Sequence, residues 1–85
     1  MTLYIVSFDT RYHVDTVESS QLKRLGTAHA NKLDDRYTLY KPGAGHYGYI
    51  WQLSQIFTIK EAAHAYINKD YNTAYKNQWE GEKDV

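Results

Sequence analysis

The sequence predicts a small α+β domain, with helices packed on one face of a small antiparallel sheet. Two hydrophobic patterns alternate along its 85 residues. Short runs rich in aromatic and β-branched residues are typical of strands, whereas apolar residues spaced three and four apart are typical of amphipathic helices. A chain of this length forms one domain, so we expect its elements, in the order β-α-β-β-α-α, to share one core. We place that domain at residues 1–79 and expect residues 80–85, which lack an apolar face, to be a frayed acidic C-terminal tail.

The first predicted strand is the apolar run from Leu3 to Phe8. Residues 10–18 carry two conflicting signals. Tyr12, Val14 and Thr16 alternate as in a strand, but residues 15–18 (Asp-Thr-Val-Glu) have the form of a capping box that opens a helix. We predict a helix over roughly 16–33, because the following apolar positions recur at helical spacing: Leu22, Leu25, His29 and Leu33.

A β-hairpin is predicted next. Residues 36–41 and 46–53 are β-rich runs, and residues 42–45 (Pro-Gly-Ala-Gly) are typical of a turn. Alternation along the second run places Tyr47, Tyr49, Trp51 and Leu53 on one face, which is either the core face or an exposed platform.

The C-terminal part predicts two helices. Residues 58–61 (Thr-Ile-Lys-Glu) match a capping box, and the following stripe puts Ile59, Ala63 and Ile67 in the core. Asp70, among poor helix formers, predicts a break near 68–72 and a cap for a second helix. The stripe then continues through Tyr71, Tyr75 and Trp79.

Composition argues against most catalytic chemistry. The chain has no Cys and its four His residues are isolated, so we expect no metal, no cofactor and no catalytic residue. Residues 43–48 fit the GxGxxG spacing, but in a strand-turn-strand context they are better explained as a hairpin turn. The absence of Cys and of any leader or long apolar stretch favours a cytoplasmic protein. A small nuclease with a histidine acid–base pair remains an alternative.

Charge is distributed unevenly along this neutral chain. Residues 1–18 carry a net charge of −2, while residues 19–79 hold eight basic side chains against four acidic ones. The basic middle segment could attract phosphate, although scattered charges on a solvated face would look the same.

Two short motifs resemble the RNA recognition motif family. Residues 3–8 (Leu-Tyr-Ile-Val-Ser-Phe) resemble its RNP2 motif, and residues 47–50 (Tyr-Gly-Tyr-Ile) resemble the centre of RNP1. The family order β-α-β-β-α-β matches our predicted order through the second helix. The resemblance implies that Tyr4, Tyr47 and Tyr49 stack RNA bases. Phosphate contacts would come from the basic middle segment, with candidates Lys23, Arg24, Lys32, Arg36 and Lys41.

The general profile of a short, Cys-free chain without catalytic motifs also resembles bacteriophage accessory proteins that inhibit host defences, including RNA-binding antagonists of toxin–antitoxin systems. Our first hypothesis is therefore a non-enzymatic RNA-binding accessory protein. The alternative is a protein-interaction module or inhibitor, whose partner is itself as a homodimer, or a host protein or ribonucleoprotein. It would dock through the aromatic residues of the C-terminal helices: Tyr66, Tyr71, Tyr75 and Trp79.

Overall fold

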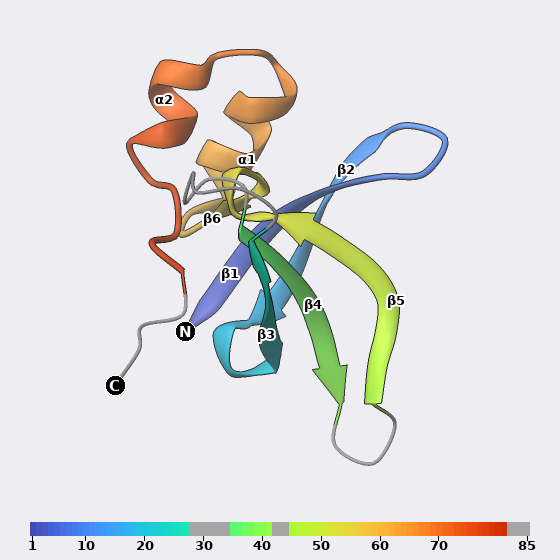
Figure 1. Cartoon of the computed structure of the whole chain (residues 1–85). Coiled ribbons are helices and arrows are strands. Elements are labelled where there is room, and N and C mark those ends of the chain that lie inside the picture. The colour runs from blue at the N-terminus through green and yellow to red at the C-terminus, as the bar shows by residue number, and fades with distance from the viewer. Residues whose placement is uncertain (28–34, 42–44, 82–85) are drawn as a thin grey trace.

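The computed structural model describes residues 1–27, 35–41 and 45–81, with the backbone alone at residues 26–27, 40–41 and 45–49. Its strands form two three-stranded antiparallel sheets, and two short helices follow them (Figure 1). The α+β class is confirmed. The predicted order β-α-β-β-α-α and the single sheet are wrong, because strands continue through the region where we expected the first helix.

The first sheet has the strand order β2-β1-β6. Strand β1 (Thr2–Phe8) confirms the first predicted strand, and it pairs with β2 (Tyr12–Glu18) along its whole length. The short strand β6 (Ile56–Phe57) pairs with the other edge of β1. Of the two conflicting signals at residues 12–18, the strand-like alternation was therefore the correct one. The expected capping box fails because Glu18 instead caps a single 3₁₀ turn, η1 (Ser19–Gln21).

The second sheet is an antiparallel meander in the order β3-β4-β5. Its strands are β3 (Leu22–Thr27), β4 (Asp35–Lys41) and β5 (Gly45–Gln52), so the predicted hairpin of the last two is confirmed. Both pairings contain an irregularity. Between two successive pairs of the hairpin, β4 advances two residues while β5 advances four, and this bulge falls on residues 47–49. Strict alternation therefore does not run through the whole of β5.

The main core lies between the two sheets. The first sheet contributes Leu3, Ile5, Val17 and Ile56, and the second contributes Leu22, Tyr37 and Trp51, followed by Leu53 from the 3₁₀ turn η3 (Leu53–Gln55). Trp51 and Leu53 thus lie on the core side, as alternation and burial favoured. Because β1 alternates, its other face is free to pack against the helices.

Helices α1 (Lys60–Ile67) and α2 (Tyr71–Tyr75) cover that other face of the first sheet. Ala62, Ala63 and Ala74 are fully buried there, and small side chains allow the helices to approach the sheet closely. The predicted break is confirmed, with the Asp70 side chain accepting a hydrogen bond from the backbone N–H of Thr73.

Two details of the first helix differ from expectation. The N-cap is Ile59, without a side-chain cap, so the predicted capping box at residues 58–61 is wrong. The hydroxyl of Thr58 instead donates to the carbonyl of Asn77, because the C-terminal segment runs back beside β6. Ile59 is 39% exposed, so its predicted place in the core is also wrong, whereas Ala63 is buried and Ile67 packs partly buried against the same cluster.

The segment after α2 closes one end of the fold. The N–H of Trp79 donates to the carbonyl of Ile56, and the Trp79 ring meets Tyr37 edge to face at 5.0 Å. Gly81 is buried against Tyr37 and Leu53. Among the described residues, neither helix has the length and apolar character needed to cross a membrane.

Candidate functional site

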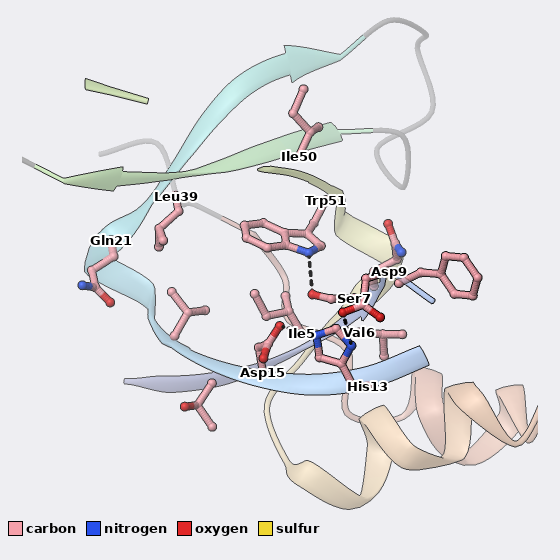
Figure 2. A pocket seen from close by; sticks show the side chains of 14 residues that line it. Ile5, Val6, Ser7, Asp9, His13, Asp15, Gln21, Leu39, Ile50 and Trp51 are labelled. Atoms are coloured by element: carbon pink, nitrogen blue, oxygen red, sulfur yellow. Dashed lines mark hydrogen bonds and ion pairs between the residues drawn. The ribbon is translucent and has the colours of Figure 1, made fainter. Parts of the chain in front are cut away.

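A groove of about 660 Å³ opens between the two sheets, beside the β1–β2 hairpin (Figure 2). Strand β2 borders one side and β5 the other, and each is an outer strand of its sheet. Ligand pockets in proteins are commonly about 300–1,000 Å³, so the groove is large enough for side chains of a partner. We refer to it as the groove; its lining residues are Ile5, Val6, Ser7, Phe8, Asp9, His13, Asp15, Thr16, Val17, Gln21, Leu39, Ile50, Trp51 and Gln55.

Trp51 forms the central wall of the groove. Its indole Nε1–H donates to the Ser7 hydroxyl at 3.1 Å, which joins the second sheet to the first across 44 residues of sequence. This bond fixes the ring plane and satisfies a polar group that is largely buried. Leu39 and Ile50 extend the apolar wall, and Ile50 is 56% exposed. The wall is therefore apolar and rigid at its centre.

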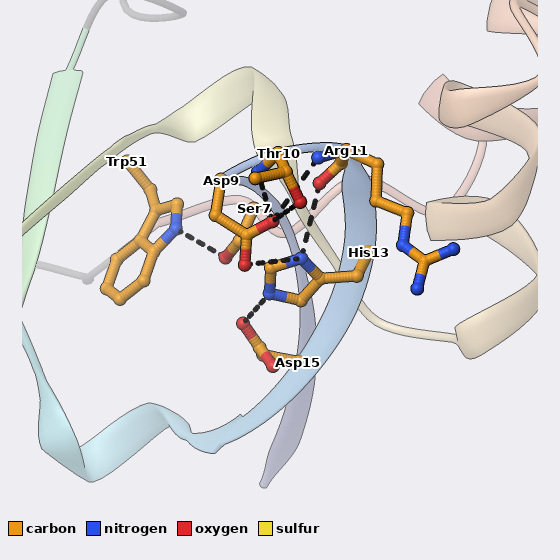
Figure 3. Close-up of polar contacts among 7 residues, drawn as sticks. All are labelled: Ser7, Asp9, Thr10, Arg11, His13, Asp15 and Trp51. Carbon is orange, nitrogen blue, oxygen red and sulfur yellow. Dashed lines mark hydrogen bonds and ion pairs between the residues drawn. The ribbon is translucent and has the colours of Figure 1, made fainter.

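Three titratable side chains form the rim, which we call the rim cluster: Asp9, His13 and Asp15 (Figure 3). His13 lies between the two carboxylates, with Nε2 at 3.1 Å from Asp15 Oδ2 and Nδ1 at 3.9 Å from Asp9 Oδ2. The same Nδ1 is 3.5 Å from the Arg11 carbonyl oxygen. Both ring nitrogens thus face oxygen acceptors.

Asp9 also shapes the hairpin turn. Its carboxylate accepts hydrogen bonds from the backbone N–H groups of Arg11 and Thr10, and these bonds hold the pKa of Asp9 below its ordinary value of 3.8. The carboxylate is therefore charged at neutral pH. The Arg11 guanidinium points away from the rim cluster, and no Lys or Arg is among the described lining residues (Figure 3). The rim carries net negative charge.

The described contacts of Ser7 and His13 do not join the two side chains as a nucleophile and its base. Ser7 and His13 are cross-strand partners, but the Ser7 hydroxyl accepts from Trp51 and both His13 nitrogens are directed at other oxygens. Activation of a serine needs a base within hydrogen-bond reach of its hydroxyl. In residues 1–27, 35–41 and 45–81, no group of three or more His, Asp or Glu side chains could hold a metal ion.

A second feature is a set of aromatic rings on the hairpin and on the helices, which cover the face of the first sheet opposite the groove. On the hairpin, Phe8 and Tyr12 meet edge to face at 4.9 Å, and they are 64% and 53% exposed. On the helices, Tyr71 and Tyr75 stack at 5.9 Å, and both contact Tyr66. Burial raises the pKa of Tyr66, and the nearby Tyr75, Tyr71 and Tyr12 raise it further. Val14 of β2 and Tyr66 of α1 pack against the same buried cluster, so the hairpin lies beside the first helix. We call these five residues the aromatic surface.

The residues proposed for RNA binding are dispersed. Lys23 and Arg24 lie on β3, not on a helix, and Arg36 lies exposed on β4. Arg24 binds the buried Asp35 through two contacts, of 3.3 and 3.4 Å. Tyr4 is half-buried and packs against the cluster beneath the helices. The RNP2-like run lies on β1 and the RNP1-like run on β5, in different sheets.

None of the remaining candidates is among the described residues that line the groove. Lys32 and the side chains of Lys41, Tyr47 and Tyr49 fall outside the described residues. Three of the four residues proposed for protein contact lie together in the aromatic surface, whereas the Trp79 ring packs against Tyr37.

Sequence reasoning missed the rim cluster and the two hairpin aromatics. The only signal was the net charge of −2 over residues 1–18 together with the alternation of Tyr12, Val14 and Thr16. Alternation puts His13 and Asp15 on one face of a strand, but nothing local shows that this face meets Trp51. Comparison with protein-family models, curated proteins and solved structures finds no match to this chain.

Proposed function

We propose that this protein is a non-enzymatic interaction module that binds another protein through the aromatic surface. The observation that carries the proposal is the exposure of Phe8, Tyr12, Tyr71 and Tyr75, all between 44% and 64%, on a hairpin and a helix that pack on the same buried cluster through Val14 and Ala74. Rigid aromatic side chains dominate the energetics of protein interfaces, and exposed apolar patches mark such sites. Tyrosine hydroxyls keep the patch compatible with water while it is unoccupied.

RNA, our first candidate from the sequence, has less geometric support. Two cations with described side chains, Lys23 and Arg36, are exposed on the second sheet, while Arg24 is engaged with Asp35. Binding to phosphate gains from each neutralised charge, so the two exposed cations described on the second sheet would by themselves give weak affinity at physiological salt. The carboxylates of the rim cluster oppose phosphate on the groove side.

The test is purification of the tagged protein from its source cells with quantitative mass spectrometry. We expect a protein that is enriched by the wild type, depleted at least tenfold by Tyr12→Ser/Tyr75→Ser, and retained by Leu25→Ser. Leu25 is a matched control because it is 39% exposed on the second sheet. The enriched protein must bind again when both components are purified.

Three results would contradict the proposal. Enrichment that survives the tyrosine changes excludes the aromatic surface. A partner lost with Lys23→Glu/Arg36→Glu and with ribonuclease treatment indicates RNA. A concentration-dependent mass of about twice 10.0 kDa by light scattering, abolished by the tyrosine changes, assigns the surface to a second copy of this chain.

A further inference from the structure

We propose that the groove binds an extended segment of the partner protein that carries an arginine, with the guanidinium held by Asp9 and Asp15. This inference rests on the proposed function and specifies the chemistry of its ligand. The occupant is argued from the charge, the shape and the strand edges of the groove.

Charge selects a cation. Asp9 and Asp15 stand on either side of His13 at the rim, and their side chains are 70% and 50% exposed. Asp15 Oδ2 contacts His13, so the second oxygen of this carboxylate faces no described partner. A carboxylate offers about four acceptor positions, and a guanidinium presents five donors in a planar fork. Two carboxylates at one rim, on either side of His13, therefore offer acceptor positions that the planar fork of a guanidinium can use better than the single point charge of lysine.

The apolar wall of the groove favours apolar groups in the ligand next to the charged guanidinium. This wall is formed by the apolar side chains of Trp51, Leu39 and Ile50. The Trp51 indole N–H already donates a hydrogen bond to the Ser7 hydroxyl, so it is not available to a ligand. The aliphatic stem of arginine and a flanking apolar side chain can cover this wall while the charged head stays at the wet rim. A phosphate-rich ligand would meet two carboxylates there, which disfavours nucleic acid.

The backbone of the groove favours an extended ligand. In the described part of the chain, β2 and β5 are each paired on one side only, and the groove lies between them. Outer strands present backbone donors and acceptors to which an extended segment can hydrogen-bond, and the side-chain alternation of such a segment would send one face to the wall. Phe8 belongs to both the groove and the aromatic surface, so one partner could contact both.

The two tryptophans make a direct test possible. In ¹H–¹⁵N spectra each indole N–H gives one resonance: Trp51 lines the groove, whereas Trp79 does not line it and packs against Tyr37, the cross-strand partner of Trp51. The probe is a capped hexapeptide of alternating valine and arginine. Two matched peptides carry citrulline, the neutral isostere, or glutamate in place of arginine.

We expect saturable movement of the Trp51 indole signal with the arginine peptide and a smaller movement of the Trp79 signal, because only Trp51 lines the groove. The citrulline peptide should bind at least tenfold more weakly, and the glutamate peptide should not bind. Asp9→Asn/Asp15→Asn should remove the preference for arginine over citrulline; asparagine at position 9 retains the acceptor for the turn. Glu61→Gln/Asp70→Asn removes the same charge from the exposed helical side, keeps a helix cap, and should bind like the wild type.

Specific outcomes overturn the inference. No saturable Trp51 shift up to about 1 mM arginine peptide refutes the site. Equal affinity for the arginine and citrulline peptides refutes the role of the carboxylates. If the double variant loses its native spectrum, Asp15→Asn, which keeps Asp9, takes its place. An unchanged preference for arginine over citrulline in that single variant refutes the role of the carboxylates as well. A Trp51 shift caused by a uridine dodecamer assigns the groove to RNA instead. The proposed function is tested separately: Tyr12→Ser/Tyr75→Ser should leave peptide binding intact while partner capture fails.

Discussion

Truncation of Phe57 should remove much of the protein's free energy of unfolding, whereas truncation of nearby Ile59 should remove little of it. Phe57 is fully buried, pairs with Tyr4 across the first sheet and packs at 5.6 Å from the Tyr66 ring. Losing a buried phenylalanine removes its transfer free energy and leaves a cavity, so we expect Phe57→Ala to cost about 3–5 kcal/mol. Ile59 is 39% exposed and leaves little cavity, so Ile59→Ala should cost about 1–2 kcal/mol.

The assay is urea denaturation followed by the far-ultraviolet circular dichroism signal. A chain of 85 residues is expected to have a free energy of unfolding of about 4–13 kcal/mol, so the larger loss is a substantial part of the total. The midpoint should fall steeply for Phe57→Ala with an unchanged m-value. If Ile59→Ala proved as damaging as Phe57→Ala, the packing of the helices on the first sheet would be wrong.

Three further predictions follow from individual contacts. Gly81 has a φ of 96°, and a Cβ there would lie 2.8 Å from a buried tyrosine hydroxyl, so Gly81→Ala should lower the melting temperature, with no change counting against a packed C-terminal segment. The hydroxyl of Thr2, then the terminal ammonium, hold the pKa of Glu18 below its ordinary 4.5. The charged carboxylate therefore stabilises the fold above the ordinary pKa of 4.5, and this stabilisation is lost as the pH falls through the lower pKa of the folded state. Glu18→Gln should thus lower the melting temperature near about pH 6 but not near about pH 2. Arg24→Gln removes the cationic partner of buried Asp35 and should lower the free energy of unfolding, measured by urea titration, by on the order of 3 kcal/mol. The double variant Arg24→Gln/Asp35→Asn, which also removes the buried charge, should recover most of this loss.

Patterns that act between near neighbours were sufficient for several elements. The apolar run of β1, the β4–β5 hairpin around its glycine-rich turn and the break between α1 and α2 at Asp70 were predicted because each depends on residues a few positions apart. The inward face of Trp51 and Leu53 follows from alternation at the end of β5.

The choice between helix and strand at residues 12–27 required the tertiary structure. Helical spacing and a possible capping box competed with alternation, and local propensities differ by too little to decide. Pairing of β2 with the whole of β1 decided it, because Val17 becomes buried opposite Leu3. Leu25, which we expected on the apolar face of a helix, lies instead at a bulge of β3 and is 39% exposed.

The sequence by itself determined the α+β class, the aromatic character of the chain and the acidic charge of its first 18 residues. It also placed Tyr66 on the stripe of the first helix and Tyr71 and Tyr75 four residues apart on the second, and the two helices bring these rings together. Only the tertiary structure decided that Asp9, His13 and Asp15 face a groove walled by Trp51, and that the hairpin and the helices pack on the same cluster. The physical reason is that residues about 40 positions apart meet through the packing of two sheets, and that packing is a property of the whole core, not of any local segment.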